Sequence, residues 1–182
     1  NPPDKSLSVI QVVWEGGGSV TLTNFSIHPA LVYSELITAD IIYYFREKIE
    51  SMTGGEAMFI NGACGGVDAN LDRGWKRARD AGELMAYYTL KALEKPISSP
   101  SFQISQKTRN IFIPLENNFF VVASILGFIP DLRDKEGRIS LEINYLELGP
   151  VKILTAPGEG FPSIWLRLKG EMKGGVNMFW GL

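Results

Sequence analysis

A glycine-rich segment in the first half of the chain constrains the fold more than any other feature. Residues 57–60 (Ala-Met-Phe-Ile) are an apolar run of strand length, and residues 61–70 read Asn-Gly-Ala-Cys-Gly-Gly-Val-Asp-Ala-Asn. A helical pattern follows. A strand that ends in glycines and leads into a helix is typical of α/β proteins, because the glycine backbone can approach a ligand closely there. We therefore expect an α/β fold with a functional site near this loop.

The rest of the pattern predicts a mixed β-sheet flanked by helices, in one domain over residues 1–182. With 45% hydrophobic residues, a chain of this length can bury a core. Alternating apolar and polar residues predict two hairpins, residues 8–27 and 139–155. Strand patterns cover residues 8–15, 19–27, 57–60, 102–114, 139–148, 151–155 and 176–182, and helical patterns cover residues 38–52, 74–95, 118–128 and 161–168.

The longest predicted helix, residues 74–95, carries several aromatic residues. Leu84 and Tyr88 fall on its apolar face, and we expect Trp75, Tyr87 and Tyr88 to pack in the core. Gly82 lies near the middle of this helix. A glycine there costs up to about 1 kcal/mol relative to alanine. We expect Gly82 to mark a close contact between the helix and the sheet.

Composition excludes several classes of protein. Eighteen basic and 20 acidic residues give a net charge of −2, which lacks the basic footprint of a nucleic-acid-binding protein. No apolar run approaches the roughly 20 residues of a transmembrane helix, and the polar residues 1–5 do not resemble a signal peptide. One cysteine permits no internal disulfide. The cellular compartment stays open.

Metal-ligating residues are scarce. The chain contains one histidine, His28, and one cysteine, Cys64. Zinc sites in proteins usually draw on several histidines and cysteines. A self-contained, histidine-rich zinc site is therefore excluded, and a site of that kind must take ligands from elsewhere.

Three predicted strand ends carry chemistry-bearing residues. His28 precedes Pro29 at the end of the second strand pattern, the glycine-rich loop follows the third, and Glu159 follows Pro157 and Gly158 after the sixth. Pro29 cannot continue strand pairing and holds His28 extended. If these strands are neighbours, the three loops converge.

The residues alone leave alternatives at each position. His28 is either a metal ligand or a histidine satisfied beside a proline, and Glu159 is either a ligand or a cap for the helix that follows. Cys64 could be a nucleophile activated at a helix N-terminus. With one histidine available as its base, a small buried residue is the favoured interpretation. Asp68 could act as a base or orient water, or it could cap the next helix.

Taken together, these segments resemble the neutral (non-lysosomal) ceramidase family in its catalytic α/β domain. The resemblance spans roughly residues 8–182 and is carried by residues 24–29, residues 59–70, the alanine-rich helix with Gly82, and residues 149–165. It implies a zinc-dependent hydrolase that cleaves the amide of ceramide. By this resemblance His28 matches the second zinc histidine and Glu159 matches the carboxylate ligand.

The resemblance also marks where this chain departs from the family. The family's Gly-Asp-Val-Ser-Pro-Asn motif reads Gly-Gly-Val-Asp-Ala-Asn at residues 65–70, so Asp68 takes the position of the catalytic serine. We predict Asp68 and Asn70 as catalytic residues. The predicted substrate-binding residues are Asn61, Gly62, Gly65 and Gly66. The family's first zinc histidine and its tyrosine ligand would lie before residue 1 and after residue 182. We therefore expect an incomplete ligand set and a chain that is the middle of a larger protein.

Two functions from different classes remain. The first is a zinc-dependent hydrolase of an amide or ester bond, whose small-molecule or lipid-like substrate need not be ceramide. The second is a non-catalytic relative that keeps the fold as a binding or assembly module.

Overall fold

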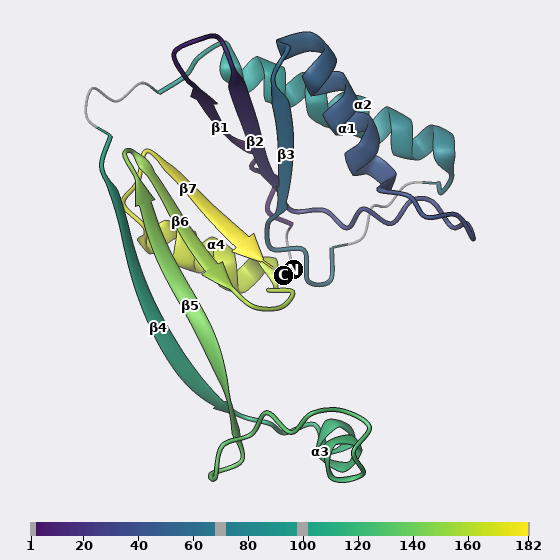
Figure 1. The fold of residues 1–182 in the computed structure, drawn as a ribbon, viewed down its shortest axis with the longest axis vertical. Helices are drawn as coiled ribbons and strands as arrows, with labels where there is room; N and C mark the ends of the chain where they lie inside the picture. The colour runs from purple at the N-terminus through teal and green to yellow at the C-terminus, as the bar shows by residue number, and fades with distance from the viewer. Residues whose placement is uncertain (1–2, 68–71, 98–101, 182) are drawn as a thin grey trace.

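The computed structural model describes residues 3–67, 72–97 and 102–181. These residues form mixed β-sheets flanked by helices (Figure 1), which confirms the predicted α/β class. None of the helices in these ranges is both long and apolar enough to cross a membrane. The elements are β1 (Ser8–Val13), β2 (Ser19–Phe25), α1 (Asp40–Thr53), β3 (Glu56–Asn61), α2 (Trp75–Leu93), β4 (Ile104–Pro114), α3 (Asn118–Ile125), β5 (Arg138–Leu148), β6 (Val151–Ala156), α4 (Pro162–Glu171) and β7 (Val176–Gly181).

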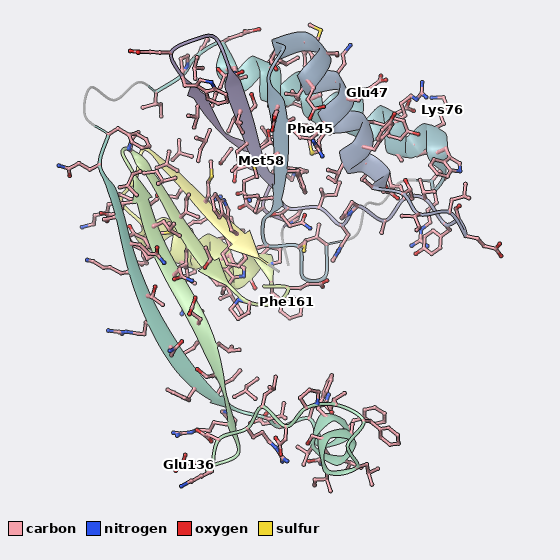
Figure 2. All side chains as sticks on the ribbon, in the orientation of Figure 1. Phe45, Glu47, Met58, Lys76, Glu136 and Phe161 are labelled. Carbon is pink, nitrogen blue, oxygen red and sulfur yellow. The ribbon has the colours of Figure 1, made fainter. Side chains whose placement is uncertain are left out.

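The first sheet has the order β1-β2-β3 and contains the glycine-rich loop at its edge. β1 pairs antiparallel with β2, as the predicted hairpin requires, and β2 pairs parallel with β3. Helices α1 and α2 cover one face of this sheet (Figure 1). Ile41, Phe45 and Ile49 recur at four-residue spacing and are fully buried on α1, which is the face that an amphipathic helix buries. Figure 2 shows Phe45 between its helix and the strands.

Gly82 marks a close contact, but with a helix and not with the sheet. A Cβ at this position would lie 2.6 Å from the carbonyl oxygen of Ile41 and 2.8 Å from the backbone nitrogen of Phe45. Both atoms belong to α1. The predicted helix–sheet contact is therefore wrong, and the glycine lets α1 and α2 approach each other closely.

The aromatic residues of α2 do not enter the core as predicted. Trp75, Tyr87 and Tyr88 are 45%, 49% and 54% exposed, and Leu84 is 56% exposed. The helix has two faces with apolar residues, and α1 covers the one with smaller side chains because it approaches so closely. The buried residues of α2 are Ala78, Gly82, Met85, Ala86 and Thr89, of which Thr89 has its hydroxyl 3.2 Å from that of Thr23 on β2.

The second sheet has the order β4-β5-β6-β7 and extends into a long arm. β6 pairs only with residues 144–148 of β5, so the distal halves of β4 and β5 continue as a two-stranded ribbon. This ribbon projects away from the rest of the molecule and ends at α3 (Figure 1). The predicted helix over residues 118–128 is confirmed at Asn118–Ile125, although Phe119 and Phe128 there are 81% and 80% exposed.

A buried asparagine, Asn24, links the two sheets near the loops that follow β2, β3 and β6. The side-chain amide of Asn24, on β2, donates to the carbonyl oxygen of Ile60 at 3.0 Å and to that of Phe179 at 2.9 Å. Ile60 lies on β3 and Phe179 on β7. Because β6 and β7 run parallel, this joint brings the loop after β6 toward the loops after β2 and β3.

Candidate metal centre

His28 reaches the site because β2 ends just before it. The loops after β2 and β3 run together: the Gly62 N–H donates to the Phe25 carbonyl oxygen at 2.9 Å, which prolongs the parallel pairing. A Cβ at residue 62 would lie 2.5 Å from the Ser26 hydroxyl oxygen, so a larger residue would require the Ser26 side chain to move. The imidazole of His28 is 28% exposed. Packing of the two loops thus places the imidazole beside the glycine-rich loop.

A second glycine joins this loop to the one that carries Glu159. The Gly65 N–H donates to the Gly160 carbonyl oxygen at 3.0 Å. A Cβ at residue 65 would lie 2.7 Å from the carbonyl oxygen of Glu159 and 2.9 Å from that of Gly160. The backbones of the two loops are in direct contact here, so residue 65 has no room for a Cβ atom. Cys64, next to Gly65, is consequently held close to Glu159.

The three loops bring His28, Cys64 and Glu159 into one cluster. The Nε2 atom of His28 lies 3.5 Å from the Oε2 atom of Glu159. One ligand atom from each of the three residues, the Cys64 sulfur included, lies within 4.8 Å of the other two. Cys64 is fully buried, whereas the Glu159 side chain is 50% exposed. The cluster therefore has a closed end at the sulfur and an open end at the carboxylate.

The electrostatics of the cluster disfavour a free thiolate. Burial, and then the negative charge of Glu159, raise the pKa of the Cys64 thiol above its ordinary value. Activated cysteine nucleophiles have a lowered pKa and partial exposure. Cys64 has neither property. Its burial agrees with the favoured interpretation from the sequence, but its place beside His28 and Glu159 does not follow from packing alone.

The donor set and its spacing fit a zinc ion. Imidazole nitrogen, thiolate sulfur and carboxylate oxygen are the ligand types that zinc takes in proteins. With metal–ligand distances of about 2.0–2.3 Å, two ligand atoms of a tetrahedral zinc site lie roughly 3.3–3.8 Å apart. The 3.5 Å between His28 and Glu159 falls in that range, and the 4.8 Å limit for the whole cluster needs only a small inward adjustment of side chains.

The structure describes some of the other predicted site residues, and the rest lie outside the described residues. Asp68 and Asn70 lie outside the described residues. Asn61 ends β3, and its Oδ1 atom is buried with no hydrogen-bond partner among the residues described. Gly66 has φ of +70°, and a Cβ there would lie 3.3 Å from the ring of Phe161, which Figure 2 shows beyond the end of the second sheet.

Glu159 lies two residues before Phe161, the N-cap residue of α4, whose own side chain makes no capping hydrogen bond. A carboxylate near this helix N-terminus is compatible with the capping alternative as well as with a ligand role. The sequence predicts that the loop carrying Cys64 converges with those of His28 and Glu159, but it favours a packing role for the cysteine and does not group it with the two candidate ligands. Its membership of the cluster depends on the contact between two loops that are far apart in the chain.

An open cavity of about 580 Å³ borders the strand ends that lead into the cluster. Ile60 from β3 and Pro157 from the Glu159 loop both line it. Its wall is mostly apolar, with a few polar groups, as in small-molecule sites of this size. The lining residues are Ile60, Ser140, Leu141, Glu142, Thr155, Ala156, Pro157, Trp180 and Gly181.

A larger groove, about 710 Å³, lies elsewhere, against α2. The exposed Leu84 and Tyr88 line it together with Lys5 and Leu7 from the N-terminal segment. The residues of the metal cluster do not line this groove. They do not line the cavity at the strand ends either, but that cavity includes Pro157, two residues before Glu159, and Ile60, at the end of the strand that leads to Cys64.

Comparison with protein-family models gives no match, and neither does comparison with curated protein sequences. Among solved structures, the chain is similar to the neutral ceramidase from Pseudomonas aeruginosa, with a TM-score of 0.67 and 16% identity over 98% of this chain. It is also similar to a ceramidase complexed with C2, with a TM-score of 0.68 and 14% identity over 98% of this chain. The chain spans 39% and 41% of those two proteins. At this level of identity the likeness establishes the fold, and the fold expected from the resemblance is confirmed.

Proposed function

We propose that this protein is a zinc-dependent hydrolase of an amide or ester bond, with His28 and Glu159 as metal ligands. The observation that carries the proposal is the convergence of His28, Cys64 and Glu159 from three separate loops, with ligand atoms within 4.8 Å of one another. Three potential ligands from distant parts of the chain, in a fold shared with ceramidases, favour a metal centre over an incidental ion pair.

A bound zinc ion supplies a Lewis acid that polarises the substrate carbonyl and activates a water molecule. His28 and Glu159, from the loops after β2 and β6, would hold this metal. Asn61 keeps its proposed substrate-binding role at the end of β3. Asp68 and Asn70 keep their proposed catalytic roles, with Asp68 as the base.

The glycines contribute mainly through the backbone. The N–H groups of Gly62 and Gly65 already donate to Phe25 and Gly160. They are therefore engaged in holding the loops, and we assign these two glycines a positioning role in the substrate site. Gly66 keeps its proposed place on the substrate side of the loop.

We infer the substrate class from the cavity at the strand ends that lead into the cluster. A cavity of about 580 Å³ with an apolar wall takes a small molecule or part of a lipid-like chain. The net charge of −2 gives no attraction to strongly anionic substrates. We propose an N-acyl amide with an apolar acyl group. Ceramide is one such amide, and the ceramidases with this fold cover more than twice the length of this chain.

The metal content of the protein, purified without chelator, tests this proposal. We expect about one zinc ion per chain and hydrolysis of short N-acyl amides or ceramide. His28→Ala should lose the metal and reduce hydrolysis by at least about 100-fold, because direct ligands matter more than their supporting residues. Glu47→Gln is the matched control, since Glu47 is an exposed residue on α1 away from the loops (Figure 2) and should leave both unchanged. Metal-free wild-type protein, or full metal content in His28→Ala, would contradict the proposal.

A second candidate function is a non-catalytic binding or assembly module. The arm that ends at α3 favours it, because large exposed apolar groups on a projecting element are typical of interaction surfaces. Segments of a larger parent protein are the proposed partners. A protein without zinc and without hydrolytic activity, but with a stable fold, would support this candidate instead.

A further inference from the structure

We propose that Cys64 is the third protein ligand of the metal, so that His28, Cys64 and Glu159 complete a catalytic-type site within this chain. This inference rests on the proposed function, since it requires a metal in the cluster. It goes further because it gives the cysteine a direct role and removes the need for ligands from other segments.

Two backbone hydrogen bonds hold the loop that carries Cys64. The Val67 N–H donates to the Cys64 carbonyl oxygen at 2.8 Å, which closes a tight turn. The Gly65 N–H donates to Gly160, which ties the same turn to the Glu159 loop. Cys64 thus has little freedom, and its sulfur lies with the imidazole and the carboxylate. A preorganised ligand loses little conformational entropy when it binds.

Three ligands are the number that a catalytic zinc site needs. Such sites have three protein ligands and keep the fourth position open for water or substrate. In this cluster the sulfur of Cys64 is buried and the carboxylate of Glu159 is half-exposed, so the three side chains would hold a metal with one side of the cluster accessible to solvent. With His28 neutral, a thiolate and a carboxylate together balance the charge of a divalent ion.

A thiolate ligand also selects the metal. Soft sulfur favours zinc over magnesium and calcium, which take oxygen ligands. On binding, the Cys64 thiol releases its proton to solvent as the sulfur–metal bond forms. The site therefore favours zinc, or a similar ion such as cobalt, over magnesium and calcium, and binding is accompanied by release of one proton from the cysteine.

Sulfur ligation has signatures that do not depend on activity. In zinc-loaded wild-type protein, X-ray absorption should show one sulfur atom at about 2.3 Å from zinc. In cobalt-substituted protein, a near-ultraviolet thiolate-to-cobalt charge-transfer band should appear. Cys64→Ser should abolish both and weaken zinc affinity by at least about 100-fold, because it removes a direct ligand. Ser34→Ala, at an exposed serine outside the cluster, should leave both signatures intact.

The outcomes separate this inference from the proposed function. Stoichiometric zinc with nitrogen and oxygen ligands alone would overturn the role of Cys64 and leave the hydrolase proposal standing. Absence of bound metal would overturn both. If Cys64→Ser does not fold, the absorption spectrum of the wild-type protein decides alone, because a sulfur atom at bonding distance is either present or absent.

Discussion

At the scale of single residues, the site depends on Gly65, which has no side chain that could bind a metal or take part in a reaction. Gly65 lies where two backbones meet, and the carbonyl oxygens of Glu159 and Gly160 occupy the space that a Cβ would need. A larger residue must push the Cys64 loop away from the Glu159 loop. The spacing of the metal cluster is therefore set by backbone contact as much as by the ligands themselves.

We expect Gly65→Ala to destabilise the protein by about 1–3 kcal/mol, the usual cost of overpacking. It should also weaken zinc binding, because Glu159 moves relative to Cys64. Gly170→Ala is the control: nothing lies within 4 Å of a Cβ there, and the residue is in α4. Since alanine favours helix over glycine, this control should stabilise by up to about 1 kcal/mol. Chemical denaturation and zinc titration measure both effects, and wild-type zinc affinity in Gly65→Ala would contradict the expectation.

Sequence reasoning reached the site residues unevenly. The convergence of the loops that carry His28, Cys64 and Glu159 could be expected because each loop follows a strand, whereas the ligand roles of His28 and Glu159 were implied by the family resemblance. The distance of Cys64 from the other two side chains could not be predicted, because it depends on contacts that no local pattern encodes, above all the contact of Gly65 with Gly160. Asn61 was predicted for its place at the strand end, but the burial of its Oδ1 atom is a property of the folded loops.

At the scale of elements, hydrophobic periodicity predicted where the helices lie but not which face of a helix is buried. Helix α2 carries apolar groups on two sides. The side that packs is the one with Ala78, Gly82 and Ala86, because close approach of α1 requires small residues. Tyr88 and Leu84 lie on the side that lines the larger groove. Hydrophobic periodicity identifies the most apolar face of a helix. In this structure, the face of α2 that packs against α1 is the one with small side chains.

The arm, formed by the distal halves of β4 and β5 and by α3, contributes few side chains to the core. Phe119 and Phe128 at its end are exposed. We expect Phe119→Ser and Phe128→Ser to change the free energy of unfolding by no more than about 0.5 kcal/mol, as at other exposed sites. Phe45→Ala, which removes a fully buried ring of the same type, should cost about 3–5 kcal/mol.

Denaturant titration of the three variants measures these values, and zinc content should be unchanged in the two serine variants because the arm ends far from the cluster (Figure 1). A loss of more than about 2 kcal/mol on changing Phe119 would show that the ring is buried against something in solution, since cavity formation in a core costs that much.

At the scale of the whole molecule, the site is assembled where two sheets are joined. Asn24 bonds to both β3 and β7, and the side chain of Lys169 on α4 bonds to Asp4, ahead of β1, at 2.7 Å. These contacts connect the first sheet, which carries His28, with the second sheet, which leads to Glu159. The fold class could be predicted from the chain, because it depends on local periodicity. Division into two sheets could not, since it depends on which distant strands pair.

Asn24 should therefore affect metal binding from a distance. Asn24→Asp keeps the size of the side chain but replaces the amide donor, so the carbonyl oxygens of Ile60 and Phe179 lose their partner in the joint. Each unpaired buried group costs about 1–3 kcal/mol, and we expect a total loss of about 2–4 kcal/mol. Zinc affinity should fall as well, because the loops after β3 and β6 are no longer held together. Asn110→Ala, at an exposed position of β4, should change neither quantity.

Denaturation and zinc titration of Asn24→Asp measure the two effects separately. If the protein loses stability while zinc affinity stays at the wild-type value, the joint holds the fold but not the site, and the loops must be positioned by their own contacts at Gly62 and Gly65. If both fall together, the metal centre is a property of the sheet junction. In that case bound zinc should in turn stabilise the protein, because a ligand that binds only the native state favours it by mass action. Addition of zinc should then raise the melting temperature of the wild-type protein more than that of Asn24→Asp.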